Sequence, residues 1–295
     1  MARRTIGWIA ALLVALALPT GVAQASTMGS IFLTGHDPDF HAFAAPNTAG
    51  AQHINQDAIK FIMDPLFNPF VAGTKKFLFV ECDTCPVAGG HVDGRQGLSA
   101  SGFVAGTDFE THGAADGLAA ELALLGTKYS GIVIGSDFGG MLTQAELNIL
   151  NADSAGIIEF LNSGGGLYAM AETTPPSGLA SSGFFGFLPF VVSTNPLSQF
   201  ETGNTLTPFG ASLGLVSADI NGNFSHNVFT TTGGLNIVDT DPLGEILSLA
   251  GRETIPTPEP GIFISLVMGM AGVALACRQG KHFGRLIVED RRNES

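Results

Sequence analysis

A strand–helix–strand pattern in the middle of the chain constrains its fold more than any other feature. Residues 131–135 form a short apolar run of the kind that is buried in a parallel sheet. Residues 142–162 repeat apolar side chains at helical spacing, and Thr143 and Glu146 match the capping box that begins a helix. A second apolar run follows at 167–171. A helix that joins two strands in this way forms a right-handed βαβ unit, so the sequence predicts an α/β domain with a mostly parallel sheet.

The residues on either side fit the same plan. Apolar runs bounded by turn residues predict strands, and a repeat of apolar residues every three to four positions predicts helices. These patterns predict strands at 30–34, 76–80, around 103–109, 235–238 and 245–250, and helices at 49–63 and 115–126. The alternation of strands and helices is typical of a single α/β domain.

The segment 132–172, with the glycine-rich run at 160–168, resembles the equivalent part of the class I glutamine amidotransferase-like superfamily, closest to its trehalose-utilisation-type branch. This resemblance implies a flavodoxin-like three-layer sandwich. Amidotransferases of that superfamily carry a nucleophilic cysteine on the turn after the strand that corresponds to 167–171. Here the turn reads Ala-Glu-Thr-Thr-Pro-Pro and includes Glu172 but neither cysteine nor serine. The amidotransferase reaction is therefore not supported.

The N-terminus has the pattern of a secretory signal peptide. Arg3 and Arg4 precede an apolar stretch at 6–18, and the small residues Ala23-Gln24-Ala25 follow. This order of a basic region, an apolar region and a small-residue site is typical of a cleaved export signal. We expect residues 1–25 to be removed by cleavage after Ala25.

The C-terminal end carries a second segment suited to a membrane. Pro258, Glu259 and Pro260 precede 16 uncharged residues, 262–277, and basic residues follow from Arg278 onward. As a helix, this run would be about 24 Å long, against about 30 Å for the hydrocarbon core of a bilayer. Basic residues on one flank face the cytoplasm. We therefore expect a transmembrane helix followed by a cytoplasmic tail.

Residues 256–281 resemble the PEP-CTERM sorting signal of bacterial surface proteins in their order of Pro-Glu-Pro, short apolar helix and basic end. The resemblance implies recognition by an exosortase and display at, or release from, the cell surface. The tail at 282–295 continues further than is usual in that family. The predicted organisation is a signal peptide, an exported domain at 26–255, the sorting signal and the basic tail.

The charge of the chain limits its partners. The sequence has 26 acidic residues against 13 basic ones, and many of the basic ones lie in the two terminal signals. A strongly acidic exported domain is a poor partner for nucleic acid and for anionic lipid, because both require positive charge on the protein surface. The expected partners are the exosortase, the membrane through the C-terminal helix, and the extracellular polysaccharide near which exosortase-sorted proteins act.

Four potential metal ligands directly follow the predicted strand 30–34. They are His36, Asp37, Asp39 and His41. Open α/β sheets place their sites at the carboxyl ends of strands. Imidazole and carboxylate together suit zinc, iron or manganese, and the oxygens alone suit Ca²⁺. Because Asp and Pro are also ordinary turn residues, a purely structural role remains the alternative.

Two later residues extend this candidate set. Glu172 follows the predicted strand 167–171, and His226 lies in the polar run 219–227. The resemblance to amidotransferase-like folds implies that this late histidine faces the first loop. The run itself has Asp, Asn and Gly at alternating positions, as in a Ca²⁺ loop, but it lacks the final Glu. A tight turn explains the run equally well.

Cys82 and Cys85 form a CxxC motif at the end of the predicted strand 76–80. In an exported protein this pair is expected to be a disulfide, and no second CxxC completes a zinc site. A redox role would require the pair at the N-terminus of a helix, whereas 86–90 read as a loop.

Two functions from different classes follow. The first is a noncatalytic binding or matrix protein of the cell surface, indicated by the sorting signal, the acidic composition and the missing nucleophile. The second is a metal-dependent hydrolase of carbohydrate or amide substrates that uses the candidate ligands. The second function requires the loop after strand 30–34 and the region of His226 to lie together.

Overall fold

The structure is a computed structural model that describes residues 29–86, 93–137, 139–170 and 185–252. All of these lie within one compact unit, Ser26–Ile255. The predicted signal peptide at 1–25 lies outside the described residues. So do the candidate ligand Glu172 and the sorting-motif residues Pro258, Glu259, Pro260 and Arg278. Within the described ranges, no helix is both long enough and apolar enough to cross a membrane.

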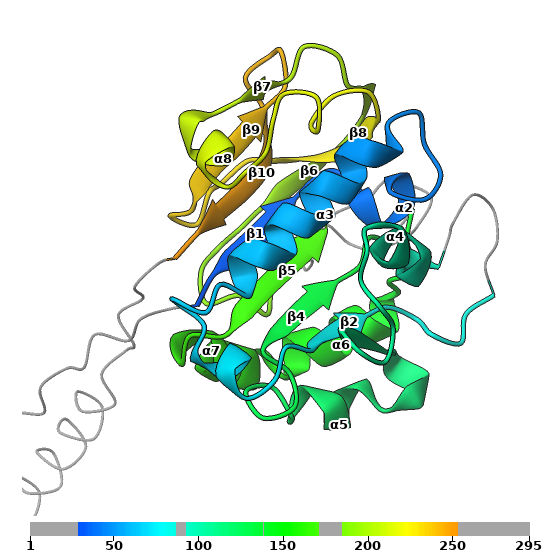
Figure 1. Ribbon diagram of the computed structural model, residues 1–295, viewed down its shortest axis with the longest axis vertical. Helices are drawn as coiled ribbons and strands as arrows, with labels where there is room; N and C mark the ends of the chain where they lie inside the picture. Colours follow the sequence, from blue (N-terminus) through cyan, green and yellow to red (C-terminus); the bar gives the residue numbers. More distant parts are fainter. Residues whose placement is uncertain (1–28, 87–92, 138, 171–184, 253–295) are drawn as a thin grey trace, which may run out of the picture. The chain divides into compact units, whose positions relative to one another are not determined.

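Five neighbouring parallel strands form one part of the sheet, with β3 at its edge (Figure 1). They lie in the order β3-β2-β4-β5-β1. Their bounds are Ile31–Thr34 for β1, Phe77–Val80 for β2, Phe109–His112 for β3, Gly131–Ile134 for β4 and Gly166–Met170 for β5. Because the strands are parallel, their carboxyl ends meet at one edge of the sheet. The α/β class predicted from the sequence is confirmed.

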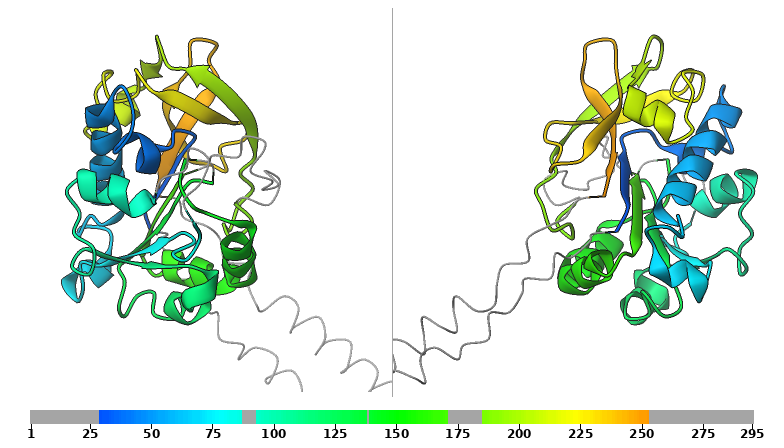
Figure 2. Two further views of the ribbon diagram at one scale, coloured as in Figure 1. Left: turned by 90° about the vertical axis from the view of Figure 1, so that its right-hand side faces the viewer. Right: turned by 60° about the vertical axis from the view of Figure 1, so that its left-hand side comes forward.

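An antiparallel part extends the sheet beyond β1. Figure 2 shows it in yellow-green to orange. It consists of β6 (Thr194–Phe200), β7 (Thr205–Leu206), β8 (Phe224–Phe229), β9 (Asn236–Thr240) and β10 (Ile246–Gly251). Strand β10 pairs with β1, β8 and β9, while β6 pairs with β8, and β7 with β9. The two closing strands predicted from the sequence are present as β9 and β10, and the antiparallel part is larger than that pair alone.

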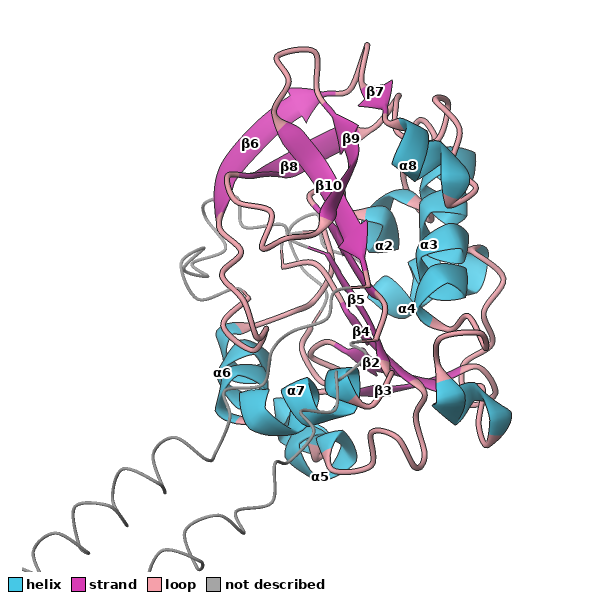
Figure 3. Cartoon of the chain, turned by 90° about the vertical axis from the view of Figure 1, so that its left-hand side faces the viewer, coloured by secondary structure: helices cyan, strands magenta, loops and turns pink. Residues whose placement is uncertain are grey.

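Helices cover both faces of the parallel strands (Figure 3). One face packs against α3 (Thr48–Ile62) and α4 (Gly94–Ala100), and the other against α5 (Leu118–Leu122), α6 (Gln144–Ala152) and α7 (Ser154–Asn162). Side chains alternate between the faces along each strand, so Phe32 of β1 enters the core under α3 whereas Ile31 and Leu33 enter the other core. The remaining helices are α2 (Pro38–His41), α8 (Pro208–Ser212) and the short 3₁₀ helices η1 (Pro69–Ala72) and η2 (Ala114–Asp116).

Three predicted elements differ from the structure. The helix predicted at 115–126 is shorter, because η2 ends at Asp116, Gly117 adopts a positive φ and α5 covers only Leu118–Leu122. The helix predicted at 142–162 is two helices, because the backbone of Asp153 leaves the helical conformation with φ −95° and ψ 17° and separates α6 from α7. The strand predicted around 103–109 begins only at Phe109. Before it, Oδ2 of Asp108 accepts the Val104 N–H at 2.8 Å, and Gly106 adopts a positive φ, so these residues form a turn.

Candidate metal centre

The loop after β1 is held directly against β8. A Cβ atom on Gly35 would lie only 1.9 Å from the carbonyl oxygen of Asn227, so the two backbones approach as closely as glycine allows. The N–H of His226 donates to the carbonyl of Gly35 at 2.9 Å. The first loop and the late histidine therefore lie together, as the hydrolase hypothesis requires.

Helix α2 then positions the next two candidate ligands. Asp37 is its N-cap residue and His41 its last residue, four positions apart, so their side chains meet on one side of this single turn. Pro38, at the first helical position, needs no hydrogen-bond partner for its nitrogen. The sequence of this short helix thus places an aspartate and a histidine beside the strand that carries His226.

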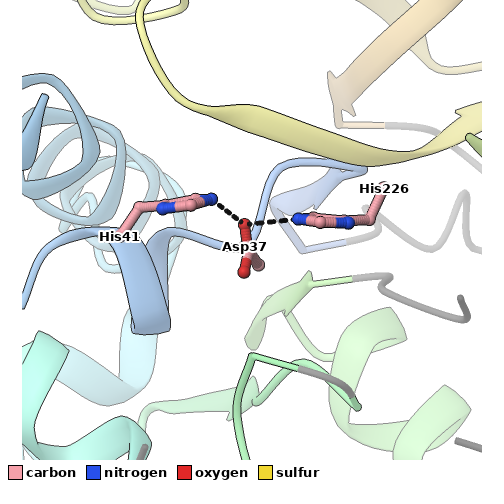
Figure 4. A group of neighbouring side chains, drawn as sticks. All are labelled: Asp37, His41 and His226. Carbon is pink, nitrogen blue, oxygen red and sulfur yellow. Dashed lines mark ion pairs between the residues drawn. The ribbon is translucent and has the colours of Figure 1, made fainter. Parts of the chain in front are cut away.

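Three side chains converge at this point (Figure 4). Nε2 of His41 lies 2.7 Å from Oδ1 of Asp37, and Nε2 of His226 lies 3.5 Å from the same oxygen. The two imidazole rings are nearly parallel, with an interplanar angle of 14° and centroids 6.1 Å apart. One ligand atom from each residue lies within 4.8 Å of the other two. A common ion with bonds of about 2.1 Å fits between three such atoms after small side-chain movements.

The central contact of this cluster is not a hydrogen bond. Oδ1 of Asp37 and Nε2 of His41 are buried, and neither has a hydrogen-bond partner among the described residues. Only 1% of Asp37 and 5% of His41 is exposed. A buried polar atom without a partner costs about 1–3 kcal/mol. A cation bound by both atoms would remove this cost.

The protonation states also suit a metal. Burial lowers the pKa of His41 to about 4, and burial together with the nearby His41 and His36 lowers the pKa of His226 to about 4. Both imidazoles are therefore neutral near pH 7, the protonation state in which histidine coordinates a metal. Burial, and the neighbouring Asp39, raise the pKa of the Asp37 carboxyl well above its ordinary value. A bound cation would oppose this rise.

His36 lies outside the cluster, contrary to its place in the predicted ligand set. Its Nδ1 is 2.6 Å from Oε1 of Glu201, and its Nε2 is 2.8 Å from Oδ2 of Asp239. Burial opposes protonation, but the two carboxylates outweigh it and raise the pKa of His36 well above 6.5. His36 is thus a buried imidazolium between two carboxylates, and neither nitrogen is available to a metal. Glu201 and Asp239 were missed from the sequence; the only local signal is that Asp239 directly follows the apolar pair Ile237 and Val238.

Asp39 also has a different role from the predicted one. Its Oδ2 accepts the backbone N–H of Ser136 at 2.7 Å, and its Oδ1 accepts the Ser136 hydroxyl at 2.8 Å. Asp39 is fully buried. These bonds tie the loop after β1 to the loop after β4, so Asp39 is a structural link rather than a ligand.

The polar run 219–227 is a turn followed by β8. Oδ2 of Asp219 accepts the N–H of Val216 at 2.8 Å, and Oδ1 of Asn223 accepts the N–H of Asn47 at 3.0 Å. Because these oxygens accept hydrogen bonds from backbone N–H groups, the geometry favours a tight turn over a Ca²⁺ loop.

Cys82 and Cys85 are joined by a disulfide, with their Cα atoms 5.5 Å apart. The pair lies in a turn directly after β2, and the next described helix, α4, begins only at Gly94. Among the described residues, which exclude 87–92, no helix N-terminus of the kind that activates a redox pair adjoins the disulfide.

A second group of possible ligands consists of Glu110, His112 and Glu121. Nζ of Lys128 lies 2.7 Å from Glu110 and 2.8 Å from Glu121, and Lys76 also contacts Glu110. These lysines already neutralise the carboxylates. The cluster of Asp37, His41 and His226 is therefore the stronger candidate.

No protein-family model matches this chain, and no curated protein is detectably similar to it.

Proposed function

We propose that this chain is an exported surface protein whose α/β domain binds a divalent transition metal through Asp37, His41 and His226. The observation that carries the proposal is the buried contact between Oδ1 of Asp37 and Nε2 of His41, which approach to 2.7 Å without forming a hydrogen bond. Two neutral imidazoles and one carboxylate are a donor set that zinc and ferrous iron prefer. Zinc is the metal we expect first, because two imidazoles and one carboxylate are an established zinc ligand set and zinc has no d-electron preference for one geometry.

The cellular address in this proposal rests on the two terminal segments. The signal-peptide pattern at 1–25 supports export, and the PEP-CTERM-like segment at 256–281 supports recognition by an exosortase and attachment to the membrane before processing. The proposed place of action is near extracellular polysaccharide at the cell surface.

The strand order supports the amidotransferase-like interpretation of the fold. Flavodoxin-like sheets have the order 2-1-3-4-5. Strands β3-β2-β4-β5 fill the first four places of that order, and the N-terminal strand β1 takes the place of the fifth. We therefore propose a flavodoxin-like three-layer arrangement. In this arrangement β1, the first strand of the chain, occupies the fifth place of the parallel order.

Metal analysis tests the proposal. The full-length chain, purified without a polyhistidine tag, should contain a transition metal in stoichiometric amount by inductively coupled plasma mass spectrometry. The Asp37→Asn and His226→Gln variants should lose it. His112→Gln is the matched control, because His112 belongs to the lysine-neutralised cluster. A folded wild-type chain that takes up no metal on incubation with Zn²⁺, Fe²⁺ or Mn²⁺ would refute the proposal.

A metal-dependent hydrolase of carbohydrate or amide substrates is the second candidate. Three protein ligands leave a coordination position for water, as in catalytic zinc sites, and this cluster lies at the carboxyl end of β1, where α/β enzymes carry their sites. The two nearest described carboxylates are already engaged, Asp39 with Ser136 and Glu201 with His36. These contacts make Asp39 and Glu201 poor general bases, so we favour a noncatalytic metal; Glu172, the remaining carboxylate of the candidate set, lies outside the described residues.

Activity assays separate the two candidates. The metal-loaded chain is tested for hydrolysis of p-nitrophenyl glycosides and of N-acetylated sugars. Turnover that disappears in Asp37→Asn and stays in His112→Gln would favour the hydrolase. A metal-loaded chain without turnover would leave the binding role.

A further inference from the structure

A second site lies at the opposite end of the parallel strands. Helix α3, the 3₁₀ helix η1 and the start of β2 enclose a cavity of about 670 Å³. Its apolar lining includes Ile59, Met63, Phe77 and Phe103. Phe77 is the first residue of β2, so the cavity is at the amino ends of the parallel strands, whereas the metal cluster is at their carboxyl ends. A cavity of this size suits an organic ligand.

Two lysines give the cavity an unusual charge for this acidic protein. The described residues contain six Lys and Arg side chains. Four of them form ion pairs: Lys76 with Glu110, Lys128 with Glu110 and Glu121, Arg95 with Asp83 and Asp93, and Arg252 with Asp64. Within the described part of the chain, Lys60 and Lys75 are the two without an ion pair, and both line the cavity.

The acidic group of the lining does not neutralise these lysines. Oδ2 of Asp108 accepts the N–H of Val104 at 2.8 Å, and no ion pair joins Asp108 to Lys60 or Lys75 within the described residues. Lys60 and Lys75 are exposed at the rim of this apolar cavity, and Lys60 also interacts electrostatically with Asp57, which does not line it. The cavity is therefore complementary to a ligand with an apolar body and an anionic end.

The position of the cavity relative to the chain end suggests the source of such a ligand. Arg252, the last described residue, contacts Asp64 at 3.2 Å and stacks on Phe61, near the end of α3, and on Phe67, in the segment between α3 and η1 that borders the cavity. From Arg252 to the apolar run that begins at Ile262, the chain can extend about 35 Å at most. The run that the proposed function assigns to a membrane thus begins no more than this length of chain after Arg252.

We propose that this cavity binds a single-chain amphiphile with a carboxylate end, with its alkyl chain on the apolar wall of α3 and β2 and its carboxylate paired with Lys60 and Lys75. The cavity and the two lysines carry this proposal without the metal site. Only the lipid source of the ligand rests on the proposed membrane attachment.

Photolabelling tests the proposal on the full-length chain in nanodiscs of neutral phosphatidylcholine. The probe is tetradecanoate with a photoreactive diazirine on its alkyl chain, and mass spectrometry locates the labelled residues. We expect saturable labelling at 56–77 and around Phe103. Dodecanoate should compete with the probe, whereas dodecanol, which lacks the charge, should compete about tenfold less well.

Three variants sharpen the test. Lys60→Gln combined with Lys75→Gln should weaken dodecanoate competition about tenfold. Lys76→Gln is the matched control, because this neighbouring lysine is already paired with Glu110 and does not line the cavity. Ala72→Trp should block labelling by filling the cavity from an exposed position, so that folding is retained.

The labelling experiment tests the cavity independently of the metal site. Labelling that is not saturable, that falls outside the cavity, or that is equal in the double lysine variant and the wild type would overturn the proposal. Metal content, measured on the same preparations, should not change in the lysine variants. Saturable labelling at 56–77 in a chain that proves not to be membrane-attached would support the cavity site.

Discussion

Nε2 of His36 lies 2.8 Å from Oδ2 of Asp239, although 203 positions separate the two residues in the sequence. With Glu201 on its other nitrogen, His36 joins the loop after β1 to the antiparallel part of the sheet. All three side chains are buried. This contact holds the neighbouring Asp37 beside β8, and so contributes to the geometry of the metal cluster.

Removing the His36 side chain should destabilise the domain strongly. His36→Ala leaves two buried carboxylates without their partner, which typically costs about 3–5 kcal/mol. Urea unfolding followed by circular dichroism measures the loss. His53→Ala is the control, because the His53 side chain is 57% exposed and its pair with Asp219 should contribute about 1 kcal/mol or less. Equal effects of the two substitutions would contradict the assigned role of His36.

The metal-free protein should lose stability as the pH falls from 6.5 towards 4. The pKa of His41 and that of His226 are lowered from 6.5 to about 4 in the folded state. Since the unfolded chain binds protons at these sites at a higher pH than the folded chain, their contribution is fully present above about pH 6.5 and is lost as the pH drops through this window. Each imidazole accounts for about 3 kcal/mol at most.

A variant isolates this effect from other titrating groups. In buffer that contains a metal chelator, the unfolding free energy of the wild type is compared with that of the double variant His41→Gln plus His226→Gln at about pH 4.5, 5.5 and 6.5. The variant should depend less steeply on pH across this range. Parallel pH profiles for the two proteins would show that these histidines are not buried in their neutral form.

The approach of the first loop to β8 should tolerate no side chain at position 35. In Gly35→Ala, the new Cβ would lie 1.9 Å from the carbonyl oxygen of Asn227, so the strands must separate and His226 must move away from Asp37. We expect loss of bound metal together with reduced stability. Gly73→Ala is the matched control, because the nearest atom to its Cβ lies at 3.7 Å and its φ is −94°. Full metal content in Gly35→Ala would show that the close approach is not required.

The cap of α6 provides a local test of the fold. Oγ1 of Thr143 accepts the N–H of Ala145 at 3.2 Å, and Glu146 accepts the N–H of Thr143 at 3.0 Å. Thr143→Ala should lower the unfolding free energy by about 1 kcal/mol. Thr127→Ala serves for comparison, because its exposed hydroxyl bonds only the carbonyl of Leu124 among the described residues. A neutral Thr143→Ala would show that the cap contributes nothing to stability.

Local pattern was sufficient for much of the sheet. The strands at β1, β2, β4 and β5 and the helix α3 match their predicted positions closely, because each is a continuous apolar run or a clear helical repeat. The break between α6 and α7 was missed, because Asp153 interrupts the backbone without interrupting the apolar repeat. Three of the predicted ligands, Asp37, His41 and His226, come together in the structure.

The sequence by itself determined the α/β class, the candidate residues after β1 and the chemical suitability of histidine and aspartate for a metal, since these depend on neighbouring residues and side-chain type. Only the tertiary structure decided which candidates meet. His36 is drawn to Glu201 and Asp239, and Asp39 to Ser136, because strands distant in the sequence pair beside them and a buried charge must find a partner. Such partners depend on strand pairing, which local sequence does not specify.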